Sequence, residues 1–271
     1  MNENAFGPQN NRTGVAIQQV GNLRYVQRAL NRYQFPGLCG FCLASDRSLL
    51  NSRRVRKWVK TLIAVLLLPL SIGATRALVR VLRDSGGADA VWVAMLAGAA
   101  CWLVIFLLLP KPMRVYVFGH ELTHALWTWL FGGRVKKFKA TSEGGHVVVS
   151  KNNFLITLAP YFFPVYVAIV VLVFVVGQLI WGWARYVVWF HLLVGAAYAF
   201  HVTLTCHALR TRQSDITQQG YVFSAVIIWL GNVTVLLLGV PLITARVSLL
   251  TALGWCLQNT GEILHRLGRL L

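Results

Sequence analysis

Two histidines and a glutamate stand in the middle of the apolar stretch "VYVFGHELTHALWTWLFGG", residues 115–133. On a helix, His120 and His124 lie one turn apart on the same face, so their imidazoles can converge on a single metal ion. Glu121 lies beside them, where its carboxylate can act on a metal-bound water. This HExxH spacing is typical of zinc hydrolases. It predicts that His120 and His124 bind Zn²⁺ and that Glu121 is a general base.

A third ligand is needed, because a catalytic zinc normally has three protein ligands and one open position. The chain has eight acidic residues, so the candidates are few. Downstream of the motif the carboxylates are Glu143, Asp215 and Glu262, and the histidines are His146, His191, His201, His207 and His265. Asp215 precedes an apolar run and has polar neighbours, a setting in which a helix bundle can hold a carboxylate.

The composition indicates a polytopic membrane protein. The chain has 271 residues, of which 56% are hydrophobic and 13% charged. Several apolar runs reach the roughly 20 residues that a helix needs to cross a bilayer. The net charge of +18 resides mainly in the first 60 residues and between the apolar runs, where the positive-inside bias and anionic lipid account for it. We therefore expect the lipid bilayer as a partner, and no nucleic acid.

Six apolar runs cover residues 58–81, 89–109, 113–131, 154–181, 186–208 and 219–244. Arg76 and Arg80 interrupt the first run, which we expect to be a short re-entrant or tilted segment. Pro110 and Pro112 separate the second run from the third, because proline ends a helix. The prediction is an all-α polytopic membrane protein with about six transmembrane segments, counting the first run, and we favour the arrangement in which that run does not cross.

The chain divides into three predicted regions. Residues 1–57 form a basic cytoplasmic or interfacial tail that contains an amphipathic helix. Residues 58–245 form the transmembrane domain, and residues 246–271 form an amphipathic C-terminal helix. If the first run does not cross, the loop 133–153 and the "RTRQSD" stretch both lie on the cytoplasmic side, as the positive-inside bias requires. Cys39 and Cys42 form a CxxC pair without a second pair, which is weak evidence for a metal site.

A metal-free interpretation of the motif is also open. His and Glu can hydrogen-bond between membrane helices or form a proton path, and ionisable residues inside a membrane usually mark a functional site. The alternative function is therefore a non-proteolytic membrane transporter or a metal-binding scaffold with a buried His/Glu/Asp cluster.

Four features resemble the site-2 protease family of intramembrane zinc metallopeptidases. They are "HELTHALWTWLFGGRV", a glycine-containing turn in "EGGHVVV", "NNFLITLAP" at the start of the next apolar run, and a later aspartate at a helix start. The resemblance covers about residues 114–225. The aspartate departs from the family pattern, because Ile216 rather than glycine follows it and no proline lies between Pro164 and Pro241.

This resemblance implies a function and a set of roles. His120, His124 and Asp215 would bind zinc, Glu121 would be the base, and "EGGHVVVS" would form a re-entrant β-hairpin after the HExxH helix. The substrate would be a membrane protein cleaved within the bilayer, and we expect the chain itself in a bacterial cytoplasmic membrane. The membrane zinc family that processes CAAX proteins offers a minor alternative, in which Glu143 or Glu262 would be the third ligand.

Two interpretations of Asp215 remain open at this point. As a zinc ligand, its carboxylate would be oriented by neighbouring polar groups, as is general at metal sites. Candidates for that support are Gln213, Ser214, Thr217 and Gln218. As an N-cap, Asp215 would instead bond the free N–H groups of the following helix, and the third ligand would be His146, His201 or His207. The oligomeric state does not follow from the sequence.

Overall fold

The computed structural model describes the backbone of residues 39–141 and 143–270, and the side chains of residues 58–141 and 143–270. The chain divides into two compact units, Met1–Arg54 and Val55–Leu271, and the architecture below is that of the second unit. The amphipathic helix predicted in the tail lies outside the described residues, as do the side chains of Cys39 and Cys42.

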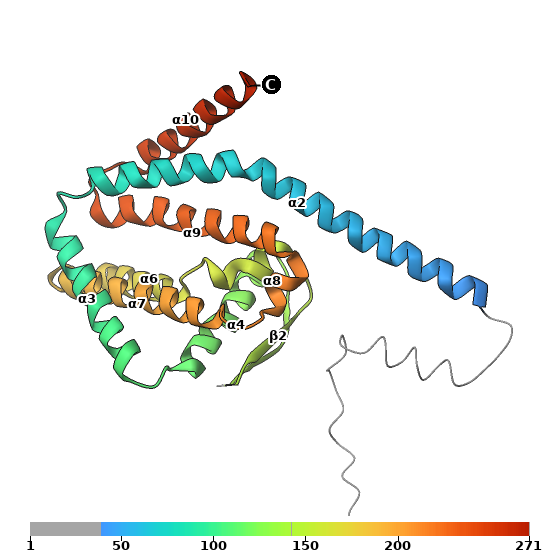
Figure 1. Ribbon diagram of the computed structural model, residues 1–271. Coiled ribbons are helices and arrows are strands. Elements are labelled where there is room, and N and C mark those ends of the chain that lie inside the picture. Colours follow the sequence, from blue (N-terminus) through green and yellow to red (C-terminus); the bar gives the residue numbers. More distant parts are fainter. Residues whose placement is uncertain (1–38, 142, 271) are drawn as a thin grey trace, which may run out of the picture. The chain divides into compact units, whose positions relative to one another are not determined.

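Four helices are long and apolar enough to cross a bilayer (Figure 1). They are residues Trp58–Asp84 of α2 (Cys39–Asp84), α3 (Asp89–Leu108), η2 with α7 (Trp183–Tyr186 and Val187–Ala208), and α9 (Tyr221–Thr244). The first apolar run is thus part of a continuous helix and not the short re-entrant segment expected from Arg76 and Arg80. A single helix holds both arginines, and Arg80 lies over the Trp255 ring with its guanidinium carbon 4.0 Å from the ring centroid.

A fifth candidate span is broken. The run 154–181 forms α5 (Phe154–Leu158), η1 (Ala159–Tyr161) and α6 (Val165–Trp181), with a bend of 82° before α6. The break follows from Pro160 in η1 and Pro164 at the N-cap of α6, because proline lacks an N–H group and disfavours helical geometry in the preceding residue. The expected six transmembrane segments are therefore not confirmed, since the described residues contain four such helices, or five with the bent pair.

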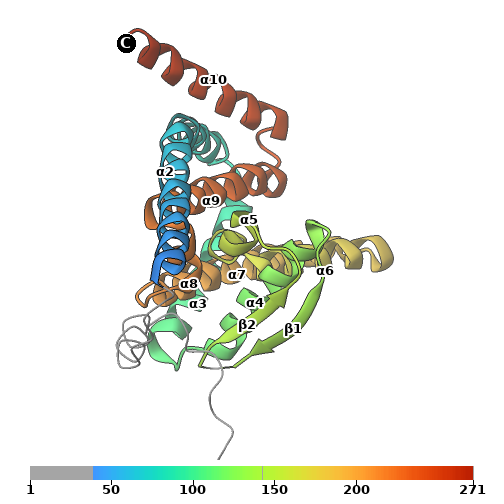
Figure 2. The ribbon, with the colours of Figure 1, turned by 90° about the vertical axis from the view of Figure 1, so that its right-hand side faces the viewer.

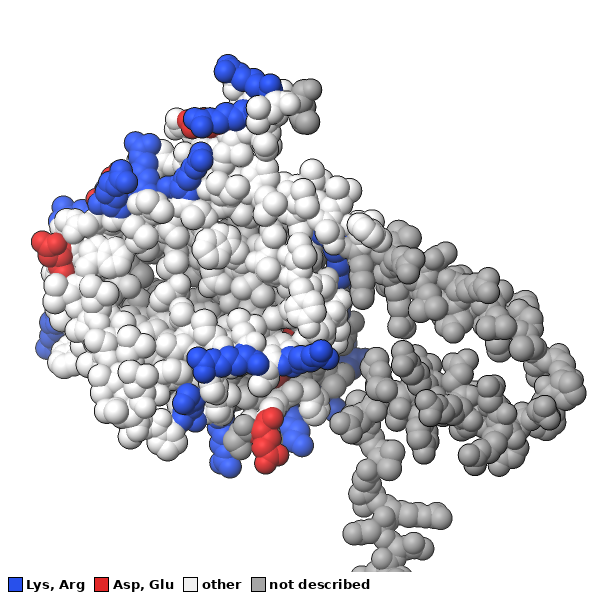
Figure 3. All heavy atoms as spheres, viewed as in Figure 1, with Lys and Arg blue, Asp and Glu red and all other residues white. Residues whose placement is uncertain are grey.

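The surface is that of a membrane protein. On the face shown in Figure 3, charged side chains gather toward two opposite sides and leave a broad belt between them that is free of charge. Large apolar side chains are exposed on the candidate spans, among them Leu107 at 76%, Leu179 at 80% and Leu242 at 69%. Exposure of this extent on soluble proteins marks an interaction surface, and here it fits contact with lipid.

The helices α2 and α9 run in the same direction. At one end, Lys60 donates to Gln219 Oε1 with an Nζ–Oε1 distance of 2.6 Å. At the other end, Thr244 donates to the Ser85 hydroxyl with an oxygen–oxygen distance of 3.4 Å. We call the end with Lys60 and Gln219 the site end, and the end with Ser85 and Thr244 the opposite end.

The helices α3 and α7 also run in the same direction as each other, from the opposite end to the site end. They approach so closely at Gly98 that a Cβ atom there would lie 1.9 Å from the Leu192 carbonyl oxygen. Farther along, Trp102 Nε1 donates to Thr203 at 2.8 Å. The helix α6 runs back against α7, with the Phe174 and Phe190 rings stacked 4.3 Å apart.

These directions determine the path of the segment between α3 and α6. The helix α3 finishes at the site end and α6 begins there, so everything between them starts and finishes at that end. This segment contains α4 (Met113–Leu130), the strands β1 (Val135–Ala140) and β2 (Gly145–Val149), and α5. The third apolar run, which we expected to cross, therefore does not carry the chain from one end to the other.

The two strands form the predicted β-hairpin, a two-stranded antiparallel sheet in which Phe138 pairs with Val147. Both strands pack on α4 (Figure 2). The turn requires glycine at Gly144, whose φ of 150° is rare for other residues. The helix α8 (Ser214–Gln219) precedes α9, and α10 (Leu249–Gly268) follows it. The α10 helix buries Ala252 and Cys256 against α2 and α9.

This path predicts which positions share one side of the membrane. Single cysteines that replace Lys137 in β1 and Arg212 before α8, in a chain whose own cysteines have been replaced, should react with an impermeant thiol reagent from the same side. Cysteines at Gly87 and Ala184, both exposed at the opposite end, should react only from the other side. Labelling of Lys137 and Arg212 positions from different sides would contradict this arrangement.

Candidate metal centre

The helix α4 presents the two motif histidines to one point, as its spacing predicts. The ring centroids of His120 and His124 lie 5.0 Å apart. Both side chains are largely buried, with exposed fractions of 12% and 14%. The Nδ1 atom of His124 lies 2.8 Å from the carbonyl oxygen of Ile156 in α5. Because a carbonyl only accepts hydrogen bonds, Nδ1 carries the hydrogen, and Nε2 is left with a lone pair for a metal.

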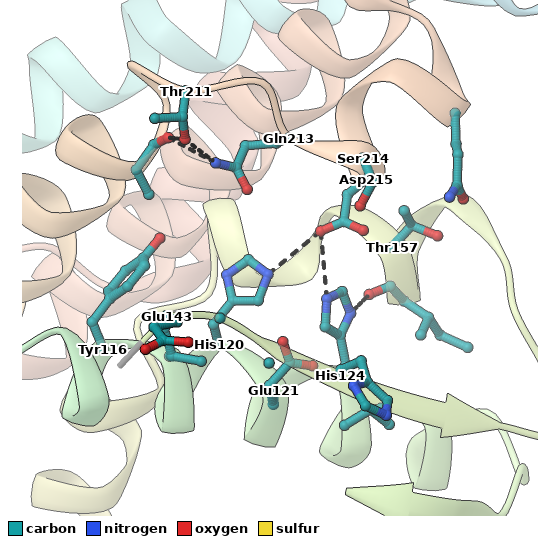
Figure 4. Close-up of a pocket in the computed structure, with 18 of the residues that line it drawn as sticks. Tyr116, His120, Glu121, His124, Glu143, Thr157, Thr211, Gln213, Ser214 and Asp215 are labelled. Atoms are coloured by element: carbon teal, nitrogen blue, oxygen red, sulfur yellow. Dashed lines mark hydrogen bonds and ion pairs between the residues drawn. The ribbon is translucent and has the colours of Figure 1, made fainter. Parts of the chain in front are cut away.

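The third member of the group comes from the first turn of α8. The Oδ2 atom of Asp215 lies 3.4 Å from His120 Nε2 and 3.6 Å from His124 Nε2 (Figure 4). One ligand atom from each of the three residues lies within 4.8 Å of the other two. Ligands about 2.0–2.1 Å from a tetrahedral zinc ion are roughly 3.3 Å from one another. Two imidazoles and a carboxylate at this spacing could hold a metal ion.

The charge on Asp215 is stabilised by its neighbours. Burial alone would raise the pKa of the Asp215 carboxyl, but the neighbouring imidazoles of His120 and His124 outweigh burial. The pKa therefore lies well below its ordinary value, and Asp215 is an anion at neutral pH. An anionic carboxylate is the form that binds a divalent cation.

A residue that the sequence analysis did not single out supports this carboxylate. The Tyr161 hydroxyl donates to Asp215 Oδ2 over 3.1 Å, and its ring stands edge-on to His120 with centroids 5.3 Å apart. Tyr161 is only 2% exposed. It lies at the end of η1, where the break in the run 154–181 turns the chain. In the sequence, the feature that could have pointed to Tyr161 is its place directly after Pro160 within an apolar run.

The polar residues next to Asp215, which were expected to orient its carboxylate, make other hydrogen bonds instead. The Gln213 side chain donates to the Ala208 carbonyl and to Thr211, and Thr217 donates to the Ser214 carbonyl. Asp215 also does not cap α8, whose N-cap residue is Gln213. Its carboxylate points into the space between the two histidines instead (Figure 4).

The group faces a cavity of about 570 Å³ into which Glu121 also projects. Glu121 is 6% exposed, and Gly145 of β2 lies directly against it. A Cβ atom at Gly145 would lie 2.8 Å from Glu121 Oε1, so glycine is required for this approach. The strand β2 lines the cavity through Gly145, His146, Val147 and Val149. The motif glutamate and the hairpin therefore share one cavity with the metal-binding group.

The other candidates lie outside the three-residue group. Glu143, His146 and His207 line the cavity without joining the group. His201 is buried on α7 beside a small separate cavity that also touches His120. Glu262 lies on α10 and accepts a hydrogen bond from Gln258. The structure thus brings Asp215 to the histidines and leaves Glu143 and Glu262, the alternative ligands, apart from them.

Comparison of the chain with models of known protein families, with curated proteins and with solved structures gives no match.

The support that Tyr161 gives to Asp215 can be measured directly. Tyr161→Phe keeps the ring but removes the hydroxyl, so the carboxylate loses a hydrogen bond that orients it. We expect zinc affinity to fall about 10- to 100-fold, the usual effect of removing such a partner, as measured by competition with a chelator. Tyr186→Phe, at the opposite end, is the matched control and should leave zinc affinity unchanged. Equal zinc affinity in the two variants would contradict the role given to Tyr161.

Proposed function

We propose that this chain is an intramembrane zinc metallopeptidase that hydrolyses a peptide bond of a membrane-embedded substrate, in the manner of the site-2 protease family. The observation that carries the proposal is the convergence of Asp215 on the two HExxH histidines, in a cavity that Glu121 and a strand of the hairpin also line. The helix α4, which contributes His120, Glu121 and His124, is otherwise largely apolar. Ionisable groups are costly in such surroundings and are retained for function.

The donor set fits zinc. Two imidazoles and one carboxylate form a common set of ligands for catalytic zinc, and they leave one position open for water. Zinc bound there would act as a Lewis acid on the scissile carbonyl and make a bound water more acidic. Asp215, held by Tyr161, and His124, held by the Ile156 carbonyl, would keep the ligand geometry fixed.

Glu121 has the position of a general base. Its carboxylate borders the same cavity as the ligands, so it can take a proton from the attacking water and deliver it to the leaving amine. The close backbone of Gly145 restricts where the carboxylate can go. Because the Glu121 carboxylate is held near the metal-binding group, it needs little reorganisation at the moment of reaction.

The hairpin supports binding of an extended substrate. A transmembrane substrate helix hides its carbonyl groups in its own hydrogen bonds and must unwind before attack. In the two-stranded sheet, β2 pairs with β1 on one edge only, and β2 is the strand that lines the cavity. A substrate strand added to the other edge of β2 would satisfy the freed backbone groups beside Glu121.

The charges support a cytoplasmic location of the site end. The hairpin and its flanks carry a set of basic residues: Arg134, Lys136, Lys137, Lys139 and Lys151. Arg210 and Arg212 lie before α8 at the same end. Loops rich in Lys and Arg stay in the cytoplasm, so we propose that the cavity opens toward it.

Substitution of Glu121 distinguishes a protease from the alternative functions. Glu121→Gln should lower hydrolysis of labelled single-span peptides by about 10²- to 10⁴-fold, because proton transfer is lost, while zinc content stays at the wild-type value. Glu262→Gln, a change of the same kind on α10, should leave both unchanged.

Two results would contradict this proposal. Turnover retained in Glu121→Gln would remove the protease function and favour the alternative, a non-proteolytic transporter or metal-binding scaffold. Zinc lost from Glu121→Gln would mean that Glu121 is a ligand or supports one, and not a base.

A further inference from the structure

Three arginines form a stripe along the last turns of α2, at the opposite end. Arg76, Arg80 and Arg83 follow one another at steps of four and three residues, so they lie on one face of the helix. All three side chains are exposed. Leu78 and Val81, on the other face of α2, are buried in the core. We call the three residues the arginine stripe.

The stripe belongs to a face of α2 that points to lipid. Ile72 lies one turn before Arg76, and Val79 lies between Arg76 and Arg83 on the same face, and both are exposed apolar side chains. At a rise of 1.5 Å per residue, Arg76 lies about 12 Å before the end of α2 at Asp84, which is inside the candidate span. A charged side chain at that depth is costly unless an opposite charge accompanies it.

The described side chains do not supply such a charge. The ion pairs among them are those of the metal-binding group, so none involves the stripe. On α2 and α10 the described carboxylates are Asp84 and Glu262, and Glu262 accepts a hydrogen bond from Gln258. The counter-charge for the stripe therefore has to come from a group other than these.

The ring of Trp255 on α10 lies beside the stripe. The guanidinium carbon of Arg80 is 4.0 Å from the centroid of this ring. Stacking on an aromatic ring fixes the plane of a guanidinium group and leaves the N–H groups at its edge free to donate. The helix α10 is held here because it approaches α2 closely: a Cβ atom at Gly73 would lie 2.2 Å from Thr260 Oγ1. Arg80 is thus oriented while its donors stay available.

The phosphate group of a membrane lipid has the chemistry that the stripe requires. Arginine binds phosphate oxygens through two parallel N–H groups, and lipid headgroups lie where the ends of the spans lie. Three positive charges favour a lipid with a net negative charge over a zwitterionic one, whose own cation the stripe would repel. With the site end in the cytoplasm, as proposed above, the positive-inside bias does not account for arginines at the opposite end.

We propose that Arg76, Arg80 and Arg83, together with Trp255, form a binding site for the headgroup of an anionic phospholipid in the leaflet at the opposite end. This inference goes beyond the proposed function. The stripe lies at the other end of the bundle from the metal-binding group, so the site is the same for a peptidase, a transporter or a scaffold. A lipid bound there would contact both α2 and α10.

Site-specific photo-cross-linking in vesicles tests this directly. The full chain, with benzoylphenylalanine in place of Val79, is reconstituted into vesicles of equal parts phosphatidylglycerol and phosphatidylcholine. Mass spectrometry of the cross-linked products gives the ratio of the two lipids at this position. We expect phosphatidylglycerol to exceed phosphatidylcholine about tenfold or more, because each arginine near anionic lipid contributes about fivefold.

A matched position and two variants complete the experiment. Val93 in α3 is another exposed valine near the opposite end, and a cross-linker there should give the lipid ratio of the bulk vesicle. Replacing all three stripe arginines with glutamine should bring the ratio at Val79 to the bulk value. Arg80→Gln alone should lower it about fivefold, and carries the comparison if the triple variant does not fold. The melting temperature of each variant, measured without phosphatidylglycerol, identifies a folding defect.

Each outcome decides the matter. Equal yields of the two lipids at Val79 in the wild-type chain would show that the inference is wrong, as would an excess that survives replacement of the stripe. An equal excess at Val93 would mean that the whole chain prefers anionic lipid and that α2 has no specific site. Cross-links from Val79 to protein in place of lipid would assign the stripe to a protein partner and would also contradict the lipid site.

Discussion

The contact of one carboxylate with two imidazoles is the constraint on which the rest of the structure depends. Asp215 Oδ2 lies 3.4 and 3.6 Å from the two Nε2 atoms in a largely buried site. Three ionisable groups in apolar surroundings are costly unless each is paired or bound to a metal. Their convergence therefore requires that α4 and α8, which are far apart in the chain, be held together by the remaining helices.

The fold holds α4 and α8 together through the breaks between helices as well as through the helices themselves. The turn before Pro164 follows η1 and leaves Tyr161 in contact with both His120 and Asp215. Asn232 of α9 donates to the Tyr161 carbonyl, which fixes the same turn from the other side. The segment from α4 to α5 enters and leaves at the site end, so the HExxH helix can tilt against the hairpin without having to cross the bilayer.

The sequence predicts the local features well and the long-range ones poorly. Residue spacing is sufficient to place His120 beside His124, whereas the hairpin was expected only from the resemblance to the site-2 protease family. Hydropathy gives the extent of most helices. It does not show that α4 fails to change ends, because that depends on where α3 and α6 lie. Tyr161 was missed for the same reason, since its hydroxyl meets a residue 54 positions away.

The central claim is that His120, His124 and Asp215 together bind one zinc ion. X-ray absorption at the zinc edge, on purified wild-type protein and on Asp215→Asn, tests it most directly. The account predicts one zinc per chain in the wild type, with two imidazole nitrogens and further oxygen ligands, and a large loss of zinc in Asp215→Asn. Full zinc occupancy and an unchanged spectrum in Asp215→Asn would contradict it, as would sulfur among the ligands.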